Sequence, residues 1–296
     1  MINELPSTRG RLKEREPLAP MAWFRVGGPA EFMLRPADIE DLCDFLRQLP
    51  LEVPVMVIGA ASNLIIRDGG VNGIVVKLGR GFGAVQVEAD GIIAGAAALD
   101  VTVSEYAAAA GLTGLEFLSG IPGTLGGAVA MNAGAYEGDM SGVLDWVDIV
   151  TRNGELKRLS VQELGLSYRH SNLASDTVVV GVRLHARPGD PTLIAAKMAE
   201  IKIKREASQP VRARTGGSTF ANPEGQKAWK LVDDAGCRGL RIGQAQVSDL
   251  HCNFLLNLGG ATAADLEGLG EEVRRQVKQK SGVSLRWEIK RIGVPA

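Results

Sequence analysis

The sequence contains few cysteines, few aromatic residues and almost no net charge. Its three cysteines, Cys43, Cys237 and Cys252, are far apart and form no C-x-x-C pair, which argues against a disulfide scaffold or a cysteine zinc site. The 33 Lys and Arg residues are balanced by 34 Asp and Glu residues, so no basic excess is available to neutralise a row of nucleic-acid phosphates. Aromatic residues make up 5% of the chain, so aliphatic side chains must fill most of the core. We expect reduced thiols and no nucleic-acid partner.

Long apolar runs are also absent. The longest weakly apolar run, 91–99, stops at Asp100, far short of the roughly 20 residues needed to cross a bilayer. Residues 1–20 are charged and lack the apolar core of a secretory signal. Neither a phosphate-binding G-x-x-x-x-G-K-[ST] motif nor a zinc-binding H-E-x-x-H motif occurs. We expect a cytoplasmic, monomeric protein with no membrane insertion and no metal site.

Glycine, by contrast, is abundant. The chain has 37 glycines in 296 residues, well above the usual frequency of about 7%. They show no three-residue period, and 45% of the residues are hydrophobic, which excludes collagen-like and disordered chains. Many tight backbone turns are needed, and a ligand that the backbone must approach closely is the most direct reason. The length by itself predicts about two domains.

The hydrophobic pattern predicts a mixed α+β protein. Residues 38–49 have helical spacing, and residues 53–58 and 73–78 are typical of buried strands. Asp-Gly and Asn-Gly turns predict β-hairpins over 84–95 and 146–159. Further elements are expected as helices over 104–110 (capped by Ser104), from about 192, over 226–235 and over 262–280 (capped by Thr262, ended by Gly282), as strands over 178–184 and 285–289, and as a linker over 187–191.

Two glycine-rich segments are candidate phosphate-binding loops. The turn 59–63 has one glycine where the dinucleotide-binding G-x-G-x-x-G motif has three, so it fits that motif poorly. Segment 114–138 reads GLEFLSGIPGTLGGAVAMNAGAYEG and leaves backbone N–H groups uncovered, which suits a pyrophosphate held without lysine. A glycine loop of purely structural purpose explains the same residues, and the residue types alone leave both interpretations open.

Residue type and local sequence alone do not indicate a catalytic role for Ser218, Glu288 or Arg169. Ser218 lies in a small-residue loop with no histidine near it in sequence, so a turn residue is expected rather than a nucleophile. Glu288 alternates with apolar residues beside Arg286 and Lys290, which is typical of a solvated, salt-bridged face. Arg169, in YRHSN, has the same ordinary explanation.

Together these segments resemble a family of flavoenzymes, the UDP-N-acetylenolpyruvoylglucosamine reductases (MurB). The resemblance runs from about Trp23 to Gly293, with the motifs in the family's order. VIGAASNLIIRDGG is similar to the flavin-pyrophosphate turn, segment 114–138 is the most specific block, and WFRVGGPA, YRHSN, GGSTFANP and RWEIKRIG complete the set. Ala61 departs from the family's G-x-G-S-N turn, and the region after Asn172 is that of the shorter form of the family, without its tyrosine-bearing loop.

The resemblance implies an FAD-binding region of the p-cresol methylhydroxylase/vanillyl-alcohol oxidase type, followed by a C-terminal α/β domain that binds the substrate. The FAD-binding region would span residues 1–190, with α/β lobes of about 1–78 and 79–190. The substrate domain would span residues 191–296, with its last strand returning near the flavin. The implied cofactor-binding residues are Gly59, Ser62, Asn63, Ser119, Gly120, Gly123, Gly126 and Gly127.

The resemblance also implies the reaction. NADPH would reduce FAD, and reduced FAD would pass hydride to C3 of the enolpyruvyl ether of a UDP-sugar, giving UDP-N-acetylmuramate for peptidoglycan synthesis. Ser218 would donate a proton to C2, and Arg169 and Glu288 would stabilise the enolate. Two alternatives stay open: a related flavoenzyme that oxidises an alcohol or sugar, and a catalytically idle flavin- or nucleotide-binding module, in which at least one of the three implied catalytic residues would be wrongly placed. The residues expected to contact the substrate are Asn222, Lys230, His251 and Asn253.

Overall fold

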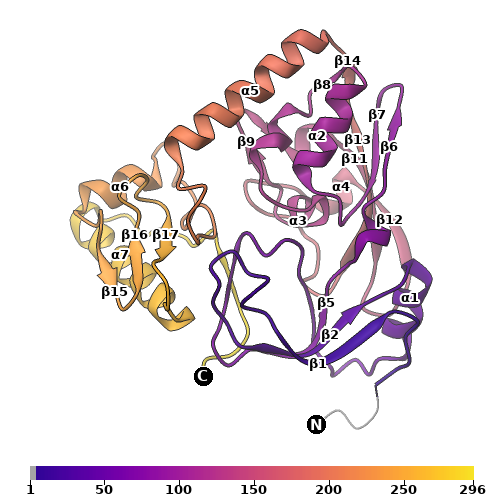
Figure 1. Cartoon of the computed structure of the whole chain (residues 1–296), viewed down its shortest axis with the longest axis horizontal. Coiled ribbons are helices and arrows are strands. Elements are labelled where there is room, and N and C mark those ends of the chain that lie inside the picture. The colour runs from indigo at the N-terminus through magenta and orange to yellow at the C-terminus, as the bar shows by residue number, and fades with distance from the viewer. Residues whose placement is uncertain (1–4) are drawn as a thin grey trace. The chain divides into compact units, whose positions relative to one another are not determined.

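The computed structural model describes residues 5–296, which form two compact units (Figure 1). The larger unit comprises the residues up to 14, then 32–60 and 73–204. The smaller unit comprises residues 15–31, 61–72 and 205–296. The units divide after residue 204, and the smaller unit also contains two segments from the N-terminal part of the chain. The roles predicted for residues 1–190 and 191–296 stay predictions.

A five-stranded antiparallel sheet forms the centre of the larger unit, in the order β12-β11-β13-β7-β6. Both predicted hairpins are confirmed, because β6 pairs with β7 and β11 pairs with β12. The first turn consists of Ala89 and Asp90, and Gly91 is already the first residue of β7. The predicted strand over 178–184 is confirmed as the central strand of this sheet. The strands are β6 (Val85–Glu88), β7 (Gly91–Gly95), β11 (Leu144–Val150), β12 (Leu156–Ser160) and β13 (Val178–His185).

A second sheet has the order β1-β2-β5-β3, and its strands β3 and β5 are parallel. The helix predicted over 38–49 is confirmed as α1 (Ile39–Gln48), and the Asp38 side chain accepts the N–H of Asp41 at its start. Apolar residues at three- and four-residue steps form the buried face of α1. The strands are β1 (Arg11–Pro17), β2 (Pro29–Arg35), β3 (Val55–Val57) and β5 (Val71–Val76).

The structure corrects the expected start of the helix over 104–110. Helix α2 (Asp100–Ala109) begins four residues before the predicted cap, and the Ser104 hydroxyl instead donates to the carbonyl of Val101 inside the helix. Part of the glycine-dense segment 114–138 forms α3 (Leu125–Ala130). The other elements of the larger unit are η1 (Arg80–Phe82), β8 (Leu112–Thr113), η2 (Glu116–Gly120), β9 (Gly134–Ala135), β10 (Gly138–Asp139), η3 (Met140–Gly142), α4 (Val161–Leu164) and β14 (Arg187–Pro188), and α5 (Pro191–Ser208) leads into the smaller unit.

The smaller unit packs helices against a three-stranded antiparallel sheet of order β15-β16-β17. The predicted capping of its longest helix is confirmed: Thr262 and Asp265 form a reciprocal capping box, and Gly282 ends the helix in the left-handed conformation. Its other strands, β4 and β18, pair in parallel. The elements are β4 (Leu64–Ile66), α6 (Ala228–Asp234), β15 (Arg241–Ile242), β16 (Ala245–Val247), β17 (Leu255–Asn257), α7 (Ala263–Ser281) and β18 (Lys290–Ile292).

The strand predicted over 285–289 is wrong in its position. Leu285 and Ile289 are buried and Arg286 is exposed, so the alternation itself is present. Regular pairing nevertheless begins only at Lys290, where β18 meets β4, and Trp287 makes a single bridge to Phe220. An alternating pattern reports which side chains are buried, whereas a strand also needs a partner along its whole length.

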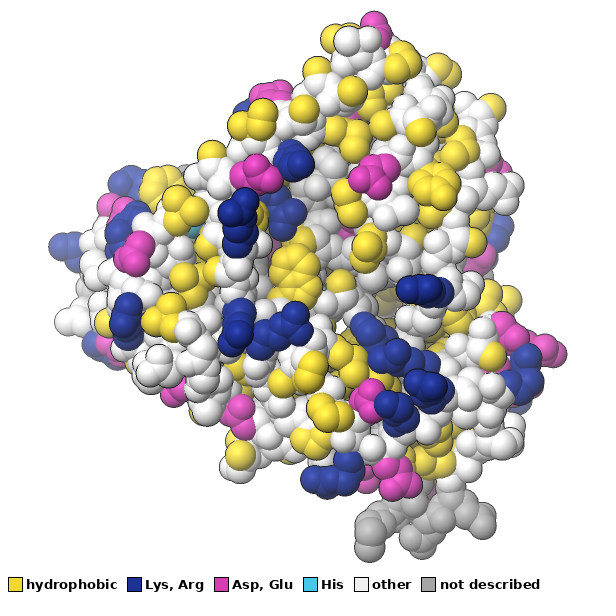
Figure 2. Space-filling model, in the orientation of Figure 1, with side chains coloured by type: hydrophobic (Ala, Val, Ile, Leu, Met, Phe, Trp, Pro, Cys, Tyr) yellow, Lys and Arg dark blue, Asp and Glu magenta, His cyan; other side chains and the backbone are white. Residues whose placement is uncertain are grey.

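Buried aliphatic side chains form the core of each unit, as the low aromatic content predicts. All three cysteines are buried free thiols. Lys and Arg side chains on the face shown in Figure 2 lie in small groups, with Asp and Glu side chains among them. Within residues 5–296, no helix is long and apolar enough to span a bilayer, and no three His, Cys, Asp or Glu side chains are grouped as metal ligands would be.

Candidate active site

Two of the segments predicted to bind FAD lie directly against each other in the larger unit. Gly59 follows β3, and Thr124 immediately precedes α3. A Cβ atom at position 59 would lie 2.2 Å from Oγ1 of Thr124, so only glycine allows this approach. Gly127 is exposed one turn further along α3, with Oγ1 of Thr124 3.6 Å from where its Cβ would be.

Backbone N–H groups at this junction are available to a ligand. Among residues 5–296, no hydrogen-bond acceptor is found for the N–H groups of Gly59, Ala60, Thr124 and Gly127. Successive uncovered N–H groups next to glycine make a concave surface that suits phosphate oxygens. The junction therefore fits the pyrophosphate of a dinucleotide such as FAD.

The other glycines predicted to bind FAD in segment 114–138 support packing inside the unit. The N–H groups of Gly123 and Gly126 donate to the carbonyls of Ile121 and Ala96, at 3.1 and 2.9 Å. A Cβ on Gly120 would lie 2.4 Å from the ring of Tyr136. The hydroxyl of Ser119 donates to the carbonyl of Glu116 at 2.7 Å. Their roles toward FAD stay predictions.

Lys77 is a residue of this junction that the sequence analysis missed. Its Nζ donates to the carbonyl oxygen of Gly59, and burial, with Arg35 nearby, lowers its pKa. A half-buried lysine needs an anion or a set of acceptors to compensate for desolvation. The available signal was a lysine at the end of a buried strand, which is an unusual position for a charge.

We expect Gly59→Ala to weaken FAD binding by about 10- to 100-fold, because overpacking by one methyl group costs about 1–3 kcal/mol. The added Cβ would force Thr124 away from position 59. Titration of the apoprotein with FAD, followed by flavin fluorescence, measures the affinity. Gly79→Ala is the matched control, since, apart from its two chain neighbours, no atom of residues 5–296 lies within 4 Å of its Cβ position. Equal FAD affinities for the two variants would contradict this role for Gly59.

In the smaller unit, the end of the same turn is joined to the segment that contains Glu288. The Asn63 side chain donates to the carbonyl of Glu288 at 3.2 Å, and the Asn63 carbonyl accepts the N–H of Lys290 at 3.1 Å. Ser62, its neighbour, is partly exposed. Ala61 has φ +51°, the left-handed conformation that glycine adopts at less cost, so the departure from the G-x-G-S-N pattern leaves a strained residue in place.

Arg169 is held in the larger unit by a strained turn. Its φ is +56°, and the backbone groups of Ser167 and His170 bond to each other on both sides of it, each at 3.0 Å. The guanidinium donates to the carbonyl of Gly134 at 2.7 Å and lies 5.0 Å from the ring centre of Tyr168. Strained residues persist where the surroundings over-determine them, which is common at functional sites.

Ser218 and Glu288 lie on neighbouring backbone segments of the smaller unit. The carbonyl of Thr219 accepts the N–H of Glu288 at 2.8 Å, and Phe220 bridges to Trp287 with ring centres 5.3 Å apart. Both Ser218 and Glu288 are partly exposed. The structure thus brings together two of the three predicted catalytic residues, which are 70 positions apart in sequence.

The four residues predicted to contact the substrate have different environments. The Asn222 side chain accepts the N–H of Ala228 at the start of α6, and exposed Lys230 pairs with Asp234 at 3.1 Å. His251 is partly buried against Phe254, with ring centres 4.7 Å apart, and burial lowers its pKa. The fourth residue, Asn253, is buried, and its side chain bonds to the backbone of Phe220.

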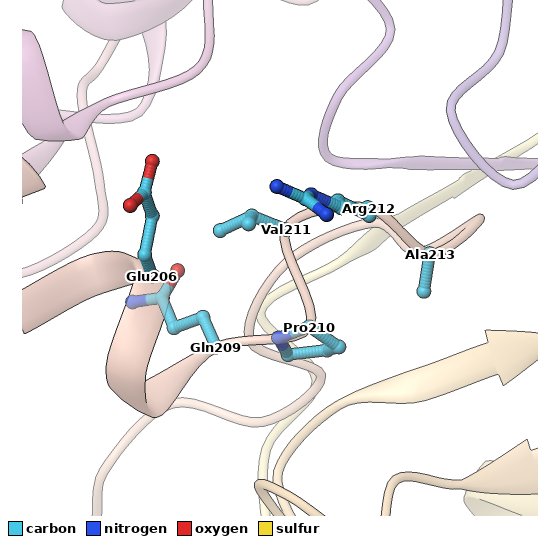
Figure 3. A pocket seen from close by; sticks show the side chains of 6 residues that line it. All are labelled: Glu206, Gln209, Pro210, Val211, Arg212 and Ala213. Carbon is cyan, nitrogen blue, oxygen red and sulfur yellow. The ribbon is translucent and has the colours of Figure 1, made fainter. Parts of the chain in front are cut away.

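A pocket of about 500 Å³ follows α5 in the smaller unit. The side chains of Val211 and Arg212 point toward the side on which Glu206 lies (Figure 3). None of the predicted site residues lines this pocket. The lining residues are Glu206, Gln209, Pro210, Val211, Arg212 and Ala213.

Comparisons with known proteins match both parts of the chain. The family of the FAD binding domain matches residues 30–160, and that of the UDP-N-acetylenolpyruvoylglucosamine reductase C-terminal domain matches residues 209–292. The chain is 65% identical over 291 residues to the UDP-N-acetylenolpyruvoylglucosamine reductase of Acidiphilium cryptum, covering 98% of this chain and 94% of that protein. It is 56% identical over 299 residues to the Rhodospirillum rubrum protein of the same name, covering 99% and 94%.

Solved structures agree. The UDP-N-acetylenolpyruvylglucosamine reductase of Thermus caldophilus superposes with a TM-score of 0.82 at 35% identity. The match covers 96% of this chain and 100% of that chain. The 6-hydroxy-D-nicotine oxidase of Arthrobacter nicotinovorans has a TM-score of 0.58 at 12% identity, over 96% and 90%, and shows the fold alone. The fold class expected from the sequence, an FAD-binding region with a C-terminal α/β domain, is confirmed. The chain belongs to the UDP-N-acetylenolpyruvoylglucosamine reductase family, a family of oxidoreductases, and carries its FAD-binding domain.

Proposed function

We propose that this chain uses NADPH to reduce the enolpyruvyl ether of UDP-N-acetylglucosamine enolpyruvate to UDP-N-acetylmuramate, a step of peptidoglycan synthesis. Family membership supplies the reaction class. The observation that carries the proposal is the pairing of the Ser218 and Glu288 segments through the Thr219 carbonyl. A proton donor and a carboxyl group in one rigid arrangement suit the reduction of an enol ether next to a carboxylate.

The junction at Gly59 would hold the cofactor. The uncovered N–H groups of Gly59, Ala60, Thr124 and Gly127 would donate to the FAD pyrophosphate, and Lys77 adds a positive charge at the same turn. Bound FAD supplies the two-electron transfer from NADPH to the substrate. Orientation, charge stabilisation and proton transfer are left to the protein.

When hydride reaches C3 of the substrate, the electron pair of the C2–C3 double bond moves toward the carboxylate as an enolate. The Arg169 guanidinium, anchored on Gly134, is a fixed cation suited to that charge. Glu288, when protonated, would donate a hydrogen bond to an enolate oxygen. The O–H bond of Ser218 then breaks as the new C2–H bond forms, and the resulting alkoxide must be reprotonated before the next turnover.

The purified protein should be yellow, and NADPH should bleach its flavin absorbance under anaerobic conditions. The enolpyruvyl UDP-sugar should restore the colour much faster than air does. A matched control is UDP-N-acetylglucosamine, which lacks the enolpyruvyl group and should restore no colour. Rapid reoxidation by oxygen together with no effect of the enolpyruvyl sugar would contradict the proposal and indicate an oxidase.

A further inference from the structure

Asn253 is almost completely buried, with 4% of its surface exposed, and both polar groups of its side chain are used. Its Oδ1 accepts the N–H of Phe220 at 3.0 Å, and its Nδ2 donates to the carbonyl of Phe220 at 2.8 Å. Its own backbone carbonyl accepts the N–H of Thr219 at 2.7 Å. One residue therefore makes three hydrogen bonds to the two residues that follow Ser218.

The Ser218 segment is held from its other side as well. The carbonyl of Thr219 accepts the N–H of Glu288 at 2.8 Å, and the N–H of Ala221 donates to the carbonyl of Arg286 at 2.9 Å. Ser218 itself forms a single antiparallel bridge to Phe254, the residue after Asn253. The backbone that carries Ser218 thus lies between the Asn253 segment and the Glu288 segment.

Asn253 is itself fixed in place by His251. The N–H of Asn253 donates to Nδ1 of His251 at 3.2 Å, which requires that ring nitrogen to be unprotonated. Burial lowers the pKa of His251 and so favours the neutral ring. The ring also packs edge-on against Phe254.

We infer that Asn253 is a positioning residue for proton donation rather than the substrate contact expected from the sequence: its side chain is buried and fully used on Phe220, and it fixes the backbone from which the Ser218 hydroxyl projects. The inference rests on the proposed role of Ser218. A proton donor must be placed within hydrogen-bond reach of the atom that it protonates, and displacements of about 1 Å can cost about 100-fold in rate. An asparagine suits the position because one uncharged side chain satisfies both a buried N–H and a buried carbonyl.

The test uses the FAD-loaded protein and the anaerobic recolouring reaction. Asn253→Ala should slow recolouring by the enolpyruvyl UDP-sugar by about 100-fold, while bleaching by NADPH and the dissociation constant of the sugar change by less than about 3-fold. Asn253→Asp keeps the acceptor for the Phe220 N–H but loses the donor to its carbonyl. This variant should be slowed in the same direction, and it serves as the second test if the alanine variant does not fold.

The matched control is Asn257→Ala, in the same unit. Asn257 is as buried as Asn253, with 6% exposed, and its Nδ2 donates to the carbonyl of Phe24 at 2.8 Å. Its Oδ1 accepts the N–H groups of Gly259 and Ala261, at 2.8 and 3.1 Å, so its loss also leaves buried backbone groups unpaired. Asn257→Ala should lower the melting temperature comparably and change the recolouring rate by less than about 3-fold.

A double-mutant cycle distinguishes a failure of the positioning role of Asn253 from a failure of the proposed role of Ser218. In a Ser218→Ala background, Asn253→Ala should slow recolouring by less than about a further 3-fold, because the hydroxyl that Asn253 positions is already absent. Full additivity, or a rate loss in Asn253→Ala no greater than in Asn257→Ala, would overturn the inference. If Ser218→Ala is slow and Asn253→Ala is not, only the positioning role fails. If Ser218→Ala recolours like the parent protein, the proposed function of Ser218 fails with it.

Discussion

Replacing Ser218 with alanine should leave the FAD-loaded protein able to accept electrons from NADPH but almost unable to pass them to the enolpyruvyl sugar. We expect bleaching at the parent rate and recolouring slowed by about 10²- to 10⁴-fold, which is what a positioned general acid contributes. The split arises because the hydroxyl is needed only when C2 is protonated. The Phe254 bridge and the Thr219 hydrogen bonds involve the backbone, so the variant should keep its fold.

Stopped-flow absorbance of the flavin measures the two half-reactions separately. Ser281→Ala is a suitable control, since the Ser281 hydroxyl donates to the carbonyl of Val277 in α7 and accepts the N–H of Val283 just after that helix. It should leave both rates unchanged. Recolouring of Ser218→Ala at the parent rate would remove Ser218 from the chemistry, and a loss of bleaching would assign it to cofactor or NADPH binding instead.

The second large effect concerns stability. Asp100 is fully buried at the first position of α2, and both of its carboxyl oxygens have no hydrogen-bond partner among residues 5–296. Burial raises the pKa of Asp100 to about 8 from a usual value of 3.8. Its N–H donates to the carbonyl of Gly123 at 3.2 Å, which ties the residue to the glycine-rich segment.

The sign of the pH effect follows from proton binding. Between about pH 4 and pH 8 the folded protein retains a proton on Asp100 that the unfolded chain has released, so the free energy of unfolding falls as pH rises through this window. At pH 7 the loss amounts to about 4 kcal/mol relative to pH 4. The Asp100→Asn side chain does not titrate, so its free energy of unfolding should not show this fall between pH 4 and pH 8.

Urea denaturation of the apoprotein at a series of pH values from 4 to 8 measures the difference. The control is Asp44→Asn, because exposed Asp44 forms a surface ion pair with Arg47 and such pairs contribute little. This control should follow the parent profile. Parallel profiles for the parent and Asp100→Asn would show that Asp100 does not carry the pH dependence.

Elements determined by local chemistry could be predicted from the sequence. The capping box at Thr262, the Gly282 stop and the two hairpins depend on residues within a few positions of each other, and all are present. Ser104 is a typical cap residue, so the sequence predicts that helix α2 begins there. The helix begins instead at Asp100, whose N–H donates to the distant carbonyl of Gly123. A tertiary contact, rather than local residue preference, therefore determines where α2 begins.

The contacts within the candidate site are non-local and could not be predicted from the sequence. The motif resemblance predicts roles for Ser218, Arg169 and Glu288, but no spacing in the sequence indicates that the Thr219 carbonyl meets the Glu288 N–H. The same holds for Lys77 at the Gly59 carbonyl and for the two hydrogen bonds from Asn253 to Phe220. Residues that position others are recognised by what they touch in the fold, and their contacts are non-local.

The most direct test of the central claim is a single anaerobic turnover with defined stoichiometry. The FAD-loaded protein is reduced with one equivalent of NADPH and mixed with one equivalent of the enolpyruvyl UDP-sugar, and the quenched mixture is analysed by mass spectrometry. The account predicts about one equivalent of a UDP-sugar heavier by two hydrogens, formed as fast as the flavin colour returns. An unchanged sugar together with a flavin that stays bleached would contradict it.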